Sequence, residues 1–436
     1  MKRLLETKRL INILDIHPDI ALETLQRARM AAFTLVKWLL CSVLSGSVIG
    51  LIGALFYKCL QYVTNIRTTY SFTLFFLPLA GIIIVFIYRL TNEADNTGTN
   101  LVITAIQSNV EVPVKVTPLI IISTLLTHLC GGSAGREGAA LQVGGSLGDF
   151  FAKLFNFDDK DTRIMIMCGM SACFSALFGT PIAAAVFSME VISVGVMYYA
   201  ALVPCIISSL TAQGIAGLLG VTPTAFTIGD ICSFNISTCL RLIIMSILFA
   251  LVSIAFCYML HTSSRIYSKY IENPYIRIVT AGILVILLRY ITGTTDYLGA
   301  GAPVIASSFL SSCAWYVFIL KMIFTAATLG GGFKGGEIVP TLFVGATLGS
   351  FLASIFGLPI GLCAACGMVS VFCGVTNCPI TSILIAFELF GFRGVSYYLI
   401  AVSISYAVSG YYGLYKDQTI VYSKYKAKYI NRHTRF

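Results

Sequence analysis

The chain has 436 residues, of which 57% are hydrophobic and only 11% are charged. Soluble proteins carry roughly 25% charged residues, so this composition excludes a soluble globular protein. The apolar runs are continuous rather than alternating, which excludes β-barrel strands and predicts an all-α, polytopic membrane protein.

The two ends of the chain carry much of the net charge of +10. Residues 1–29 are mixed and charged, and the first apolar run begins near Met30. Residues 416–436, after the last apolar run, are again basic. The positive-inside rule then predicts a cytoplasmic N-terminal segment over 1–29 and a basic cytoplasmic tail over 416–436, in a plasma (inner) membrane. These cations are expected to contact the lipid bilayer rather than nucleic acid.

Between these ends the sequence contains an internal duplication. Cys168-Gly169-Met170 recurs as Cys366-Gly367-Met368 at an offset of 198 residues (366 minus 168), and Glu190 then matches Glu388. At an offset of 201 residues (336 minus 135), Gly135 matches Gly336. These ordered matches predict one membrane repeat over 30–220 and a second over 235–415. Such halves can lie in opposite orientations and meet near the membrane midplane.

Three glycine-bearing segments each precede a new apolar run. They begin at Gly98, at Gly135 and at the Gly330-Gly331-Gly332 triplet. A glycine turn that opens a helix leaves free N–H groups and the positive end of the helix dipole at one spot. Converging helix starts of this kind, in short broken helices, predict a binding site for a small anion.

The middle segment adds a charged pair, Arg136-Glu137, between two long apolar runs. Charge at membrane depth is costly and usually functional. A glutamate at such a helix start competes with an anion for the same place, and it gives up that place when it binds a proton. The alternative is a buried structural pair at the turn.

These segments resemble motifs of the CLC family of chloride channels and transporters. Gly135-Arg136-Glu137-Gly138 is similar to the family's GREGP motif, and Gly336 to Pro340 is similar to its GxFxP motif. The resemblance implies the CLC fold, with an inverted repeat and broken helices at the anion site, and a homodimer with one anion pathway per subunit.

Three departures resemble the fluoride/proton antiporter branch of that family. Gly98-Thr99-Asn100-Leu101-Val102 replaces GSGIP, Ala139 follows the second motif, and the third contains Gly-Gly-Phe-Lys-Gly-Gly-Glu ending at Glu337. Against this, Val339 stands where that branch has threonine, and residues 101–117 contain no phenylalanine. Preference for fluoride or chloride therefore stays open at this point.

The resemblance assigns the site residue by residue. Glu137 is the gate for anion and proton, and Tyr422 falls where the family has its inner-gate tyrosine. The expected anion-binding residues are Thr99, Asn100, Gly135, Arg136, Gly138, Gly336, Glu337, Ile338, Val339 and Tyr422. Two have alternatives: Glu337 could pair with Lys334 at a surface, and Tyr422 could be an interfacial aromatic anchor.

Glu190 lies beside the position of the internal proton-transfer glutamate of chloride/proton antiporters, and that position is Val191 here. This proton relay is therefore absent, and Glu190 and Glu388 are expected to end their helices in the same structural way.

The leading functional hypothesis is fluoride export coupled to proton import, with no cofactor. The alternatives are a chloride/proton antiporter or a passive anion channel of the same fold. A membrane enzyme that uses Glu137 and Glu337 as an acid/base pair is disfavoured, because the four histidines are scattered and no metal-ligand spacing occurs.

Overall fold

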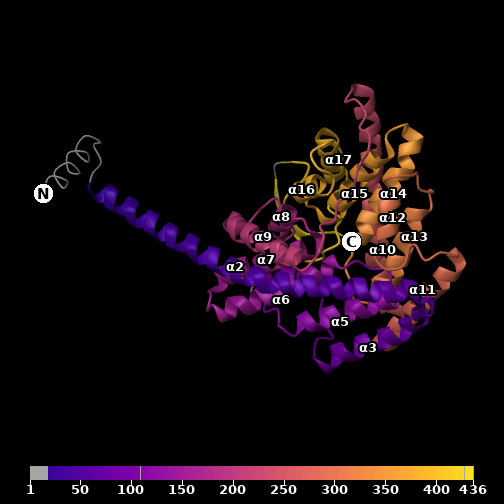
Figure 1. Cartoon of the computed structure of the whole chain (residues 1–436), viewed down its shortest axis with the longest axis horizontal. Coiled ribbons are helices and arrows are strands. Elements are labelled where there is room, and N and C mark those ends of the chain that lie inside the picture. Colours follow the sequence, from indigo (N-terminus) through magenta and orange to yellow (C-terminus); the bar gives the residue numbers. More distant parts are fainter. Residues whose placement is uncertain (1–17, 109, 427, 436) are drawn as a thin grey trace.

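The computed structural model describes residues 18–435 except 109 and 427. Most of this part is helical (Figure 1). The helices of the first half are α2 (Pro18–Thr69), α3 (Leu77–Leu90), α4 (Thr99–Ser108), α5 (Val116–Leu129), α6 (Glu137–Leu154), α7 (Asp159–Phe178), α8 (Pro181–Glu190) and α9 (Leu202–Leu218). Those of the second half are α10 (Ile236–Tyr270), α11 (Pro274–Thr292), α12 (Ala302–Ser307), α13 (Val317–Gly330), α14 (Ile338–Phe356), α15 (Ile360–Thr376), α16 (Pro379–Phe390) and α17 (Val395–Val408). Short 3-10 turns, η1 (Ser71–Phe76) and η2 (Tyr199–Ala201), precede α3 and α9.

Helix length separates full spans from broken ones. By length and composition, seven helical segments of the described residues could cross a membrane. Others, such as α8 and α16, are apolar but shorter than the roughly 20 residues that a span needs. Proline as the first residue of α8 and α16 sets where each begins, because proline lacks the N–H that a first turn leaves unpaired. The predicted polytopic helical protein with broken helices is confirmed.

The two halves repeat the same order of helices. α5 and α13 begin at Val116 and Val317, at the predicted offset of 201 residues (317 minus 116). The helices that follow also correspond in pairs: α6 with α14, α7 with α15 and α8 with α16. A Cβ on Gly144 of α6 would collide with the Gly169 carbonyl of α7, and Gly345 and Gly367 repeat this close approach in the second half. Small residues at such crossings let apolar helices pack backbone to backbone.

Reciprocal contacts join the halves. The Glu190 carboxylate, at the end of α8, accepts hydrogen bonds from the Ile380 and Thr381 N–H groups at 3.0 and 2.8 Å. Its repeat mate Glu388 accepts from the Ile182 and Ala183 N–H groups, both at 2.9 Å. Each glutamate thus satisfies the free N–H groups that begin a helix of the other half. Contacts of this form are what a two-fold axis between the halves produces.

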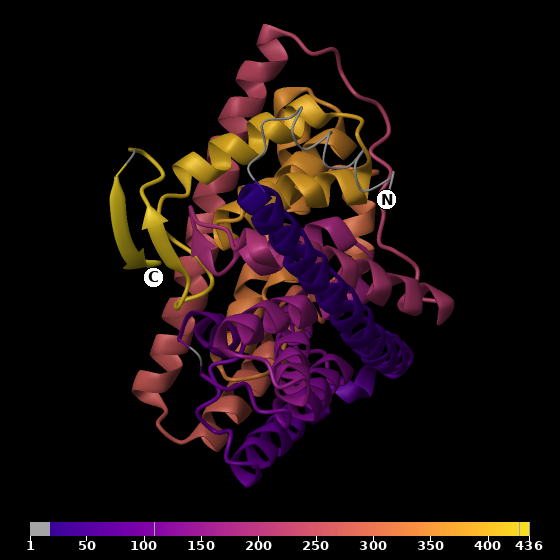
Figure 2. The same cartoon turned by 90° about the vertical axis from the view of Figure 1, so that its left-hand side faces the viewer.

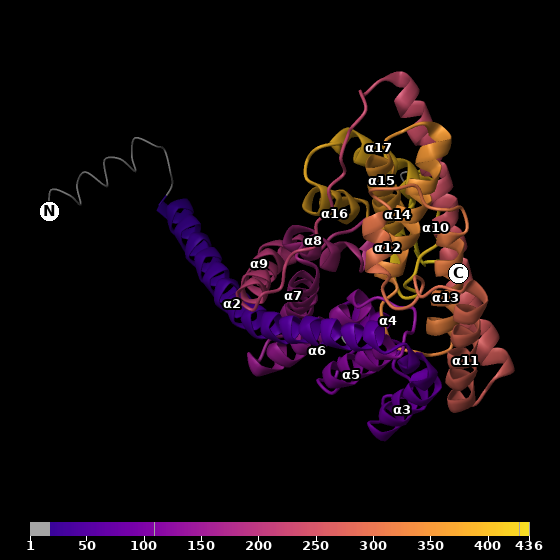
Figure 3. The ribbon, with the colours of Figure 1, turned by 45° about the vertical axis from the view of Figure 1, so that its right-hand side comes forward.

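The same relation holds at α3 and α11, which pack side by side (Figure 3). A Cβ on Gly81 would meet Ile278, and a Cβ on Gly282 would meet Pro78. The predicted duplication therefore accounts for the contacts between the halves, while their opposite orientation in the membrane stays a prediction.

The structure adds detail at both ends of the chain, and the predicted domain bounds stay predictions. α2 begins at Pro18, so residues 18–29 continue the first span as helix, because Ala, Leu, Glu, Gln and Arg favour helix there. Figure 1 shows this end of α2 projecting from the bundle. The remainder of the predicted N-terminal segment, residues 1–17, lies outside the described residues.

At the other end, the described residues of the basic tail contribute two strands to a small sheet within this mostly helical fold. β2 (Thr419–Tyr422) pairs with β1 (Ser193–Val194) in parallel and with β3 (Tyr429–His433) antiparallel. Figure 2 shows this hairpin at the edge of the helical bundle. The Thr-Ile-Val-Tyr sequence of β2 is rich in β-branched and aromatic residues, which favour strand. Just before it, the Gln418 side chain donates to the Val191 and Thr376 carbonyls at 3.0 and 2.8 Å, which ties the hairpin to both halves.

We expect Glu190→Gln to lower the thermal stability of the purified protein more than Glu388→Gln does. Glu190 is 6% exposed and accepts three hydrogen bonds, including one from the Thr381 hydroxyl at 2.6 Å. Each charge-assisted bond contributes about 1.5–3 kcal/mol, and an amide replaces at most part of that. The exposed Glu272 serves as the control, because Glu272→Gln should leave the melting temperature in detergent unchanged. Equal melting temperatures for the Glu190 and Glu272 variants would contradict this role.

Candidate functional site

The starts of α6 and α14 lie side by side and are joined through their glycine turns. The Gly135 N–H donates to the Gly336 carbonyl at 2.7 Å, and the Gly336 N–H donates to the Gly135 carbonyl at 2.8 Å. Only glycine fits at position 336, since a Cβ there would lie 2.6 Å from the Gly138 nitrogen. This two-residue bridge brings two helix starts, each with unpaired N–H groups, to the same place.

The Glu137 carboxylate occupies the place that these helix starts create. Glu137 is the first residue of α6 and is 1% exposed. Its Oε2 accepts from the Arg136 N–H at 3.0 Å, and the Val339 N–H at the start of α14 also faces the carboxylate. Its Oε1 has no hydrogen-bond partner in the described part of the chain and lies 3.6 Å from Arg136 Nε. The carboxylate therefore sits where converging N–H groups would hold a free anion.

Glu337 and Thr99 reach the same cluster from the other side. A Cβ built on Gly138 would lie 3.3 Å from both Glu337 Oε2 and the Thr99 hydroxyl oxygen. The Thr99 hydroxyl, at the start of α4, donates to the Gly138 carbonyl at 3.4 Å. Glu337 Oε2 is buried and has no hydrogen-bond partner among the described residues. The cluster therefore contains a second carboxylate with an unused oxygen.

Glu337 is not paired with Lys334 at the surface, which was the alternative interpretation of this residue. Lys334 Nζ lies over the Tyr88 ring, 4.5 Å from its centroid. Within the described ranges, no ion pair joins Lys334 to Glu337.

Of the other predicted residues, Ile338 and Val339 begin α14 and are 1% and 7% exposed. They adjoin Glu137 through their backbone. Asn100 lies one residue further along α4, and its side-chain oxygen accepts from the Asp417 N–H at 3.3 Å. The Asn100 side chain is therefore bonded to the segment after α17 rather than to Glu137.

The structure places Tyr422 at the surface and buries a different tyrosine, Tyr415, near the two glutamates. Tyr422 is 49% exposed, and its ring packs edge-on against Tyr429 with centroids 5.8 Å apart. Tyr415 is 2% exposed, its hydroxyl is buried without a hydrogen-bond partner in the described structure, and it lies within electrostatic reach of Glu337 and Glu137. In the sequence, only the position of Tyr415 directly after the last apolar run pointed to it.

A cavity of about 710 Å³ leads to this cluster. It extends from the end of α2, past the end of α11 and the loop before α12, to Arg136 and Val339. His128 also lines it and bonds through Nε2 to the Gly135 carbonyl at 3.2 Å. A water-accessible space that opens at the surface therefore meets the joined helix starts.

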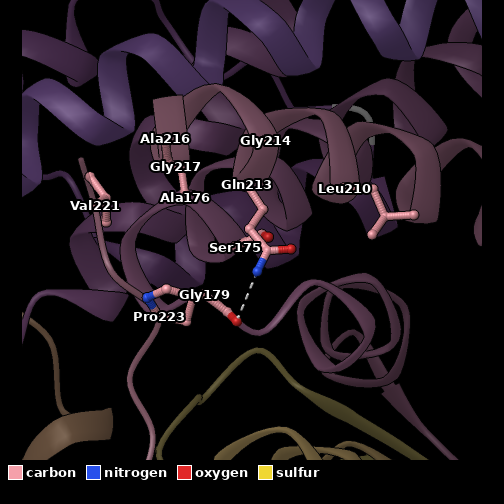
Figure 4. A pocket seen from close by; sticks show the side chains of 10 residues that line it. All are labelled: Ser175, Ala176, Gly179, Leu210, Gln213, Gly214, Ala216, Gly217, Val221 and Pro223. Carbon is pink, nitrogen blue, oxygen red and sulfur yellow. Dashed lines mark hydrogen bonds between the residues drawn. The ribbon is translucent and has the colours of Figure 1, made fainter. Parts of the chain in front are cut away.

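A smaller cavity of about 230 Å³ lies between α7 and α9 (Figure 4). Its lining has no charged residue, and its Gln213 side chain donates to the Gly179 carbonyl at 3.3 Å. This cavity offers nothing to an ion. The described residues also contain no group of three or more His, Cys, Asp or Glu side chains that could hold a metal.

Comparison with known proteins identifies the family. The sequence profile of the family described as "Voltage gated chloride channel" matches residues 79–410. A relative from Pseudomonas syringae pv. tomato, described as "Chloride/fluoride channel protein", is 35% identical over 398 residues, which cover 90% of this chain and 88% of the relative. A relative from Vibrio cholerae, described as "H(+)/Cl(-) exchange transporter ClcA", is 24% identical over 80% of this chain and 81% of its own.

A solved structure shares the fold closely. The crystal structure of a CLC-type fluoride/proton antiporter superimposes with a TM-score of 0.86 and 33% identity, covering 88% of this chain and 98% of that one. The predicted resemblance and fold are thereby confirmed: the chain belongs to the CLC family, a family of chloride channels and anion transporters rather than enzymes.

Proposed function

We propose that the chain exports fluoride across the membrane in exchange for protons. The observation that carries this proposal is the Glu137 carboxylate at the joined starts of α6 and α14, where it takes the place of an anion. Support comes from the relative described as "Chloride/fluoride channel protein" and from the likeness to the solved fluoride/proton antiporter.

The coupling follows from the charge of Glu137. While ionised, the carboxylate is held by N–H groups of both helix starts and by Arg136, so an incoming anion is repelled. Once protonated, it loses this attraction, swings aside, and leaves the N–H groups free to bind the anion. Because the anion and the carboxylate exclude each other, each anion that enters requires a proton on Glu137. That exchange links the two fluxes.

The other polar groups of the cluster suit a small anion. Fluoride is strongly hydrated, so its site needs close donors that replace water while still allowing release. The Tyr415 hydroxyl can donate, and Glu337 can donate from its unused oxygen when protonated. The Gly-Gly-Phe-Lys-Gly-Gly-Glu string that ends at Glu337 resembles the fluoride/proton antiporter branch, and this supports fluoride.

We also propose that the protein is a homodimer with both termini in the cytoplasm of a plasma (inner) membrane. The dimer rests on membership of the family, and the orientation rests on basic residues at both ends. Light scattering of the purified protein and thiol labelling in oriented vesicles test these two assignments.

The function is tested by loading proteoliposomes with fluoride or chloride at matched gradients. We expect fluoride to leave at least about tenfold faster than chloride, which corresponds to a difference of 1.4 kcal/mol. We also expect a fluoride gradient to drive protons inward, as read by an internal pH dye. Equal efflux of fluoride and chloride with proton movement would instead favour a chloride/proton antiporter. The feature that motivates this alternative is Val339, which stands where the fluoride branch has threonine. Efflux without proton movement would favour a passive channel.

Glu137→Gln should abolish proton movement driven by a fluoride gradient. Glutamine keeps the size of the side chain but can neither ionise nor carry a proton, so the exchange between anion and carboxylate stops. The control is Glu111→Gln, because the Glu111 side chain is 75% exposed and pairs only with Lys153. Proton pumping in Glu137→Gln at the wild-type rate would refute the gate.

Tyr415→Phe should reduce anion flux by about ten- to 150-fold, whereas Tyr422→Phe should stay within twofold of wild type. Loss of one hydrogen-bond donor to a charged ligand costs about 1.5–3 kcal/mol, and of these two tyrosines only Tyr415 has its hydroxyl buried beside the carboxylates. Flux of the two variants is compared in the same proteoliposome assay. The reverse order of effects would return the inner-gate role to Tyr422.

A further inference from the structure

The 710 Å³ cavity is lined by more positively charged side chains than Arg136, the one beside the Glu137 gate. Its lining includes Arg67, Arg136 and Arg289, whereas Asp296 is the only acidic residue among the lining residues that the structure describes. Asp296 is also exposed, so water screens much of its charge. An anion that enters this cavity meets a net positive surface before it reaches Glu137.

Arg67, in the last turn of α2, is the cation that the gating argument leaves unexplained. Its Nη1 atom is buried and has no hydrogen-bond partner in the described part of the chain. A buried donor of a charged group without a partner is costly, and a bound anion would satisfy it. Arg67 also lines the cavity.

The residues around Arg67 hold its guanidinium in position but supply no negative charge to it. Gly299 packs directly against the guanidinium, and any side chain at that position would collide with it. The Gly299 N–H donates to the Gly132 carbonyl at 3.1 Å, and its own carbonyl accepts from Lys321 Nζ at 2.6 Å. Lys321 is fully buried and is thereby committed to backbone carbonyls of the Tyr297–Gly299 turn. Lys321, a second buried basic residue, thus holds the turn that packs against Arg67.

Three basic side chains lie near His128, beside the gate. Arg67, Arg136 and Lys321 all lie within electrostatic reach of His128, whose ring bonds to the Gly135 carbonyl. Arg136 is held over the Tyr57 ring, 4.7 Å from its centroid, and Arg67 and Lys321 repel one another. Like charges brought close together are unfavourable unless an anion offsets them.

We propose that the cavity contains a second anion-binding site, at the Arg67 guanidinium, which receives a small monovalent anion before or after it passes Glu137. This inference rests on the proposed anion transport and adds to it a waiting position outside the gate. Arg67 supplies the buried donor, Arg136 supplies charge at the boundary with the gate, and Lys321 acts through the Tyr297–Gly299 turn as a positioning residue.

The test compares Arg67→Gln with Lys58→Gln, which removes an exposed positive charge from the same helix. The fluoride concentration that gives half-maximal flux from the cavity side should rise at least tenfold in Arg67→Gln, with the maximal rate kept within a few-fold of wild type. The Lys58→Gln variant should stay within twofold in both quantities, and Arg67→Lys should recover part of the loss. An unchanged half-maximal concentration in a monodisperse Arg67→Gln protein, with wild-type transport intact, would overturn the second site and leave the proposed function standing.

A readout that does not depend on transport uses crystals of the wild-type protein soaked in bromide, whose anomalous scattering identifies the ion. A bromide peak within hydrogen-bond distance of Arg67 Nη1, absent from Arg67→Gln crystals, supports the site even if the protein moves neither fluoride nor chloride. Ordered bromide at the helix starts with none at Arg67 would overturn it.

Discussion

The pairing of Gly135 with Gly336 is the constraint on which the rest of the structure depends. Backbone groups at membrane depth need partners within the protein, because no bulk water is there to satisfy them. The two glycines satisfy one another with bonds of 2.7 and 2.8 Å, which fixes the starts of α6 and α14 against each other. The N–H groups that remain free all face one small volume. A carboxylate at position 137 fills that volume, so the chain carries its own substitute for an anion.

The equivalent contacts of the duplicated halves position the helices, whereas the residues that differ between the halves give the site its ionisable group. Glu190 and Glu388 each cap a helix of the opposite half, and the Gly144–Gly169 approach recurs as Gly345–Gly367. These equivalent contacts hold both helix starts rigidly. At the offset of 201 residues, however, Glu137 corresponds to Ile338 (338 minus 137). Of these two symmetric helices, α6 therefore begins with a carboxylate, whereas α14 begins with Ile338 and has its carboxylate one residue earlier, at Glu337.

Much of the helical arrangement could be predicted because the sequence patterns that indicate it are local and occur in both halves. The glycine turns mark the beginnings of α4, α6 and α14, and the two Cys-Gly-Met triplets reveal the duplication. Tyr415 could not be separated from Tyr422 by pattern, since several tyrosines follow the last span and only tertiary packing buries one of them. The sheet was missed because β1 has two residues and β2 has four, which is too short for an alternation to be recognised. The setting of Arg67 depends on Gly299 and Lys321, which lie more than 200 residues further along the chain.

The central claim is that the Glu137 carboxylate and the transported anion compete for one site. Calorimetric titration of purified Glu137→Ala and wild-type protein with fluoride at neutral pH, repeated with chloride, tests it most directly. Removal of the competing carboxylate should tighten binding of the transported anion by about tenfold or more, while Glu388→Ala leaves the affinity at its wild-type value. An affinity for both anions that is unchanged or weaker in Glu137→Ala would show that the carboxylate and the anion occupy different places.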